Sequence, residues 1–62
     1  MPTITLEAGK LNMNQKKQIV KEFTATASKI LNLPEQVFTV YLKENELENI
    51  GFGGKLISEE SN

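Results

Sequence analysis

The sequence predicts an α+β protein built from one βαβ unit with parallel strands, followed by a short, glycine-rich hairpin near the C-terminal end. Two strand-like segments, 3–7 and 37–42, lie on either side of one long amphipathic helical pattern. No hairpin turn separates these segments, so the chain has the parts of a crossover unit. Such crossovers are right-handed in about 98% of cases and leave their two strands parallel.

The first predicted strand follows the N-terminal end directly. Residues 3–7 alternate polar and apolar side chains, and Ile4 and Leu6 share one face. This alternation is typical of a half-buried strand. Residues 8–11 then form a loop in which Gly9 can adopt a positive φ.

The predicted helix has clear signals at both ends. Asn12 is a good N-cap and Gln15, three residues later, completes a capping-box pattern, although Asn14 is an alternative start. The helix should end near residues 32–33, because the residue before Pro34 is pushed out of the α region. Apolar residues at helical spacing form one stripe, and Phe23 within it is expected in the core. The stripe comprises Ile19, Val20, Phe23, Ala27, Ile30 and Leu31.

The second half of the chain contains the second strand and the hairpin. Residues 37–42 are rich in β-branched and aromatic side chains, which favours a strand. Residues 44–49 form a polar connection, and three glycines among apolar residues in 50–57 predict a tight hairpin. The polar tail 58–62 is expected to be frayed.

The length of the chain sets a limit on its stability. We expect the 62 residues to form a single domain, 1–62. A chain of this size buries only about 60% of its unfolded surface, so its core is marginal. Cysteine and histidine are both absent, which excludes disulfides and leaves little for a transition metal. Oligomerisation is therefore the expected way to complete the core.

The charge pattern limits the range of partners. Seven lysines and eight glutamates give a net charge of −1, without the basic stripe that a nucleic-acid partner requires. No apolar run approaches the ~20 residues of a membrane span, and no signal peptide is recognisable at the start. We therefore expect a cytoplasmic protein that binds neither nucleic acid nor membrane.

Pro2 is the leading candidate for acid–base chemistry. A small second residue generally allows Met1 to be removed, which would leave Pro2 with a secondary amine. An α-amino group titrates at about 7.7–8.0, and burial lowers that value. With no histidine or cysteine in the chain, no other group obviously titrates near neutral pH.

The order and spacing of these motifs resemble the tautomerase superfamily, in particular its small 4-oxalocrotonate tautomerase group. The resemblance covers nearly the whole chain. It depends on Met1-Pro2 opening a strand, on Asn14-Gln15-Lys16 starting the helix, on the second strand within 37–44, and on the glycine-rich segment 50–56.

This resemblance implies an assembly and a reaction. The expected assembly is a homohexamer, a trimer of dimers. The expected activity is that of a cofactor-independent isomerase, which interconverts the enol and keto forms of a 2-hydroxy-dienoate or 2-oxo acid. Pro2 would act as general base and then as general acid, and the reaction would use no cofactor and no metal.

Three positions depart from the pattern that the resemblance implies. The chain has no arginine, whereas typical members have one after the first strand and one in the second strand. Lys10 stands at or beside the first of those places, Thr39 occupies the second, and Ile50 occupies the place of an aromatic wall. Lys10, Thr39 and Ile50 are thus the candidate substrate-binding residues. With these departures we expect a dicarboxylate such as 2-hydroxymuconate to bind poorly, and a monocarboxylate or a neutral enol to be the alternative substrate.

A second hypothesis belongs to a different class. The chain could be a non-catalytic or vestigial oligomeric scaffold, or a small-ligand binder, that kept the fold after losing its arginines. The two hypotheses differ in whether any enol-to-keto rate depends on Pro2.

Overall fold

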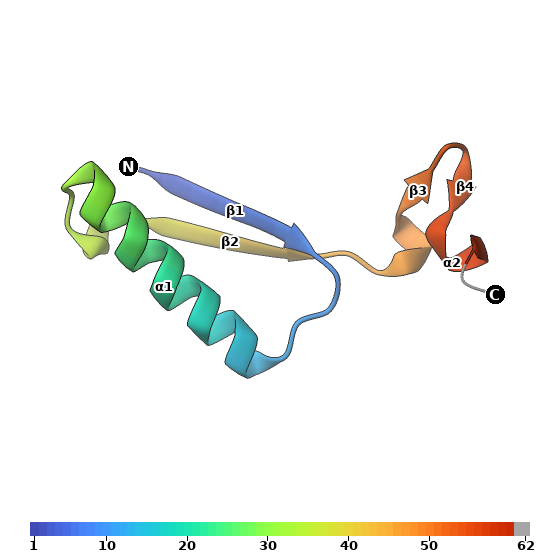
Figure 1. Cartoon of the computed structure of the whole chain (residues 1–62), viewed down its shortest axis with the longest axis horizontal. Coiled ribbons are helices and arrows are strands. Elements are labelled where there is room, and N and C mark those ends of the chain that lie inside the picture. The colour runs from blue at the N-terminus through green and yellow to red at the C-terminus, as the bar shows by residue number, and fades with distance from the viewer. Residues whose placement is uncertain (61–62) are drawn as a thin grey trace.

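A computed structural model describes residues 1–60 of the chain. The βαβ unit is formed by β1 (Thr3–Ala8), α1 (Met13–Leu31) and β2 (Thr39–Glu44), as predicted (Figure 1). Its C-terminal extension comprises a short 3₁₀ helix η2 (Leu47–Asn49), strands β3 (Gly51–Phe52) and β4 (Lys55–Leu56), and a short helix α2 (Ile57–Glu60).

The two long strands pair in parallel, with a register that runs from Thr3 opposite Thr39 to Ala8 opposite Glu44. The helix α1 runs along one side of this two-stranded sheet (Figure 1). Side chains alternate between half-buried and exposed along β1, as the pleat of a strand with one covered face requires. The uncovered side of the sheet, here called the open face, comprises Thr3, Thr5, Glu7, Thr39, Tyr41 and Lys43.

The predicted start of α1 is confirmed. The Gln15 amide N–H donates to the Asn12 side chain at 2.8 Å, and the Asn12 N–H donates to Gln15 Oε1 at 3.0 Å. These two bonds satisfy backbone donors that the first turn of a helix leaves unpaired. Asn14 lies inside the helix, so the alternative start there is wrong.

The end of α1 is also close to the expected position. Asn32 adopts a left-handed conformation (φ 57°, ψ 47°), and its N–H donates to the Ser28 carbonyl. Asparagine tolerates this region better than most residues do, and the conformation stops the helix. The Leu33 N–H also donates to the Ser28 carbonyl, at 3.1 Å.

The second strand begins and ends two residues later than predicted. Its expected first residue, Val37, instead ends the short 3₁₀ helix η1 (Glu35–Val37). Sheet pairing starts only at Thr39, whose N–H donates to the Pro2 carbonyl at 3.1 Å. The pattern of β-branched residues indicated a strand correctly, but the partner strand decides where its hydrogen bonds begin.

The C-terminal hairpin is confirmed, but part of the tail that was expected to be frayed is helical. Gly53 and Gly54 have φ values of 60° and 88°, which a tight two-residue hairpin turn demands and glycine adopts without strain. Residues 57–60, part of which was expected to be frayed, form the short helix α2. The Leu56 N–H donates to Glu59 Oε1 at 3.2 Å and caps its start. Residues 61–62 of the predicted tail lie outside the described residues.

The protomer lacks an interior. Among residues 1–59, for which burial is defined, no side chain is fully buried. Phe23, expected in the core, is 40% exposed, and Ile30 at the end of the same stripe is 75% exposed. One layer of helix on two strands leaves four of the six stripe residues exposed, Phe23 among them, so the predicted core position of Phe23 is not reached within one protomer.

Because the capping box holds the start of α1, we expect Asn12→Ala to lower the free energy of unfolding by about 1 kcal/mol. Urea denaturation at a fixed protein concentration measures the change. Asn14→Ala is the matched control: it removes the same side chain two residues further on, where the structure shows no capping bond, and should be close to neutral. Equal effects of the two variants would contradict the capping assignment.

Candidate functional site

Pro2 and Thr39 are the two predicted site residues that one protomer brings together. The hydrogen bond from the Thr39 N–H to the Pro2 carbonyl, 3.1 Å long, is the first rung of the parallel ladder. Pro2 is half-buried and immediately precedes β1. Its nitrogen is therefore held at one end of the sheet, beside the start of β2.

Lys10 lies at the other end of β1. That strand is six residues long and spans roughly 20 Å at about 3.3 Å per residue. The Lys10 ammonium lies 3.8 Å from Glu46 Oε1, and the Lys10 side chain is 80% exposed. An exposed pair of this kind contributes little to stability, so Lys10 can exchange Glu46 for another anion at little cost.

Ile50 lies between η2 and β3, and Figure 1 shows β3 well apart from the N-terminal end of β1. Its N–H donates to the Leu47 carbonyl at 3.2 Å, and its carbonyl accepts from the Ile57 N–H at 2.9 Å. These bonds fix Ile50 where η2 passes into the hairpin. Within one protomer, Lys10 and Ile50 therefore cannot act on a molecule bound at Pro2.

A cluster around Glu44 was missed by the sequence analysis, which placed this residue in a polar connection. Glu44 Oε1 accepts from the Leu11 N–H at 2.8 Å, and Oε2 lies 2.7 Å from the Lys16 ammonium. The hydrogen bond from Lys16, followed by that from Leu11, holds the pKa of Glu44 below its ordinary value. The topology of a βαβ unit could have indicated this cluster. Its two parallel strands end at the same edge of the sheet, next to the start of the crossover helix.

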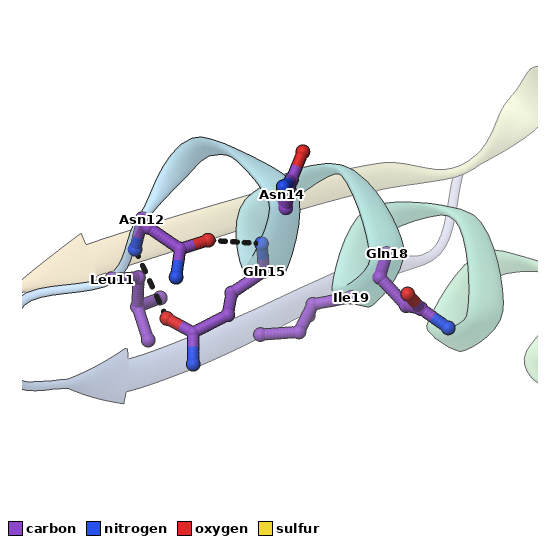
Figure 2. A pocket seen from close by; sticks show the side chains of 6 residues that line it. All are labelled: Leu11, Asn12, Asn14, Gln15, Gln18 and Ile19. Carbon is purple, nitrogen blue, oxygen red and sulfur yellow. Dashed lines mark hydrogen bonds between the residues drawn. The ribbon is translucent and has the colours of Figure 1, made fainter.

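One hollow in the described chain lies at that same end, away from Pro2. It has a volume of about 460 Å³. Figure 2 shows two of its side chains, Asn12 and Gln15, joined to the backbone by the capping box. These polar groups are already hydrogen-bonded to the backbone at the start of α1, so this hollow is not a candidate catalytic site. Its lining residues are Leu11, Asn12, Asn14, Gln15, Gln18 and Ile19.

Residues 1–60 contain neither a metal-binding cluster nor a membrane-spanning helix. In this part of the chain, no three histidine, cysteine, aspartate or glutamate side chains gather where a metal ion could be held. No helix there is both long enough and apolar enough to cross a membrane.

Comparison with known families identifies the class of protein. The family described as Tautomerase enzyme matches residues 3–60. The match covers nearly the whole chain, and the chain therefore belongs to this family. No curated protein matches the sequence.

Solved structures agree with this assignment. DmpI from Archaeoglobus fulgidus is 32% identical, with 92% of this chain and 98% of that chain covered and a TM-score of 0.80. DmpI from Helicobacter pylori is 24% identical over 94% and 98% of the two chains, with a TM-score of 0.77. A 4-oxalocrotonate tautomerase homologue covers both chains completely at 24% identity and a TM-score of 0.88. The last two likenesses establish the fold.

The Glu44 cluster predicts a pH dependence of stability. Since the pKa of Glu44 in the folded chain lies below its ordinary value of 4.5, its ionised form stabilises the fold above that value. This contribution is lost as the pH falls through the lowered pKa. Glu44→Gln should therefore lower the urea midpoint at about pH 7 and approach the wild-type midpoint at about pH 3.

Glu48→Gln is the matched control, because Glu48 is an exposed residue of η2. It should have little effect on the urea midpoint at either pH. A Glu44→Gln deficit that stays constant between the two pH values would contradict the role of the ionised carboxylate.

Proposed function

We propose that this protein is a cofactor-independent tautomerase that interconverts enol and keto forms of a 2-hydroxy-dienoate or 2-oxo acid, with Pro2 as general base and general acid. The observation that carries the proposal is the position of Pro2 directly before β1 in a chain of the Tautomerase enzyme family. Met1 is 93% exposed, which supports its removal by an aminopeptidase. A cytoplasmic location stays a prediction.

The proton transfers follow from a secondary amine at the start of β1. The Pro2 nitrogen accepts the proton of the substrate's enol O–H, and the O–H electrons form the carbonyl bond. The electrons of the carbon–carbon double bond then take the proton from the Pro2 ammonium, which forms the new C–H bond. Such a shuttle is most efficient when the pKa of the amine lies near the ambient pH.

The proposed site needs more than one copy of the chain. Pro2 and Thr39 stand at one end of the protomer, whereas Lys10 and Ile50 stand at the other, so these four residues can surround one substrate only across copies. The exposed apolar surface supports such an assembly, since Phe52 in the hairpin is 81% exposed. We propose the homohexamer, a trimer of dimers, as the active form.

Replacing the amine should remove the activity. We expect Pro2→Ala to lower kcat/KM for ketonisation of an enol by at least about 10²-fold, the usual contribution of a positioned acid–base group. The loss of enol absorbance measures the rate. Pro34→Ala, which changes the other proline and leaves the amine in place, should keep most of the activity.

Intact mass spectrometry distinguishes this mechanism from the alternative of a non-catalytic scaffold. The mature chain should lack Met1 and gain one adduct per chain from 3-bromopyruvate, and Pro2→Ala should gain none. A chain that retains Met1 and is not labelled would have an amide at Pro2 and no base. That outcome would favour the scaffold or ligand-binding function.

The assembly has its own test. Sedimentation equilibrium of the wild-type protein should give the mass of a hexamer, because the protomer by itself exposes most of its apolar stripe. Phe52→Ser should shift the protein to smaller species and lower kcat/KM in parallel. A monomeric wild-type mass, with full activity, would contradict a site shared between copies.

A further inference from the structure

The segment at the end of β2 holds the loop that connects β1 to α1. The Asn45 N–H donates to the Ala8 carbonyl at 2.8 Å, and the Leu11 N–H donates to Glu44 Oε1, also at 2.8 Å. Lys10 lies in the chain between these two hydrogen bonds. Its backbone is therefore fixed on both sides by two successive residues of the neighbouring strand segment.

Packing contributes little to the position of this loop. A Cβ added at Gly9 would meet no atom beyond its chain neighbours within 4 Å, and the Lys10 side chain is 80% exposed. Since a glycine in open space leaves the backbone free to move, the two hydrogen bonds decide where Lys10 stands. The bond from Asn45 joins two backbone groups, whereas the bond to Glu44 depends on a side chain.

The Glu44 carboxylate is itself held in place. Its second oxygen, Oε2, lies 2.7 Å from the Lys16 ammonium, and these two side chains are each only 31% exposed. Lys16 belongs to α1, whose start is anchored by the capping box. One carboxylate thus joins the end of β2, the start of α1 and the loop between β1 and α1.

We propose that Glu44 is a positioning residue for the site that Pro2 and Lys10 share across copies, here called the shared site. Through the Leu11 N–H it holds the loop that presents Lys10 to a substrate carboxylate. The inference rests on the proposed function, in which Lys10 is a substrate-binding residue. A cation held in advance loses less conformational freedom on binding than a loose one, so it binds an anion more tightly. Glu44 itself does not contact the substrate.

Three substitutions separate the loop hydrogen bond from the ion pair. Glu44→Ala removes both. Glu44→Gln keeps an oxygen that can accept from the Leu11 N–H but loses the charge, and Lys16→Gln loses the ion pair but leaves the carboxylate. All three should lower the free energy of unfolding at about pH 7, but only Glu44→Ala should weaken binding at Lys10. A merely structural role would weaken binding in proportion to the loss of stability.

Titration with sorbate measures this binding without turnover, because sorbate is a conjugated monocarboxylate that has no enol hydroxyl. The amide signals of Gly9 and Thr39 in NMR spectra report the two halves of the shared site, and sedimentation equilibrium checks the assembly of each variant. We expect Glu44→Ala to weaken sorbate binding about fivefold, whereas Glu44→Gln and Lys16→Gln should bind as the wild-type protein does. If Glu44→Ala does not assemble, Glu44→Asp, which keeps the charge and withdraws the oxygen by one methylene group, replaces it.

A double-mutant cycle with Lys10 gives the sharpest comparison. Lys10→Gln should weaken sorbate binding about tenfold, which is the loss of one charge-assisted hydrogen bond. Because Glu44 acts through Lys10, adding Glu44→Ala to that variant should cause no further loss. A further loss of about fivefold in the double variant would overturn the inference. Wild-type affinity in Glu44→Ala, or a wild-type Gly9 signal that does not respond to sorbate, would overturn it as well.

These outcomes are separate from the test of the proposed function, which measures turnover and its dependence on Pro2. A protein that ketonises enols through Pro2 but shows independent effects in the cycle would keep its function and lose the positioning role of Glu44. A protein that shows the expected cycle but no turnover through Pro2 would keep the positioned cation as part of a ligand-binding site.

Discussion

The parallel pairing of β1 with β2 is the constraint on which the rest of the structure depends. Its first hydrogen bond joins the Thr39 N–H to the Pro2 carbonyl. This bond fixes Pro2 at the end of the sheet and sets the register that places hydroxyls on the open face. The same register brings Glu44 to the edge where Leu11 and Lys16 meet it. A one-residue slip would reverse the faces and break that cluster.

The small size of the protomer is the second constraint. A helix on two strands covers one face of the sheet only, and no side chain in the part of the chain with defined burial is fully enclosed. The core is incomplete in one copy, and the candidate site residues lie at both ends of that copy. Both observations lead us to expect that several copies assemble. Stability and activity would then both depend on assembly, because the surfaces that complete the core also bring the second half of the site.

Family membership and substrate choice are separate questions for this chain. Membership of the Tautomerase enzyme family identifies the class of fold and supports the class of reaction. It does not determine which substrate binds, because binding depends on the few side chains that surround the base. Near Pro2 the open face carries the hydroxyl groups of Thr3, Thr5, Thr39 and Tyr41.

Local interactions determined what the sequence by itself could predict. The capping box at Asn12, the helix stop before Pro34 and the glycine turn of the hairpin each involve residues a few positions apart, and all three are present in the structure. Pro2 was proposed as the base from its chemistry, and that role stays a prediction. The start of β2, the Glu44 cluster and the separation of Pro2 from Lys10 and Ile50 were decided by tertiary structure. They depend on which distant residues meet across the sheet and on the end of the protomer at which each residue lies. No short stretch of sequence encodes either.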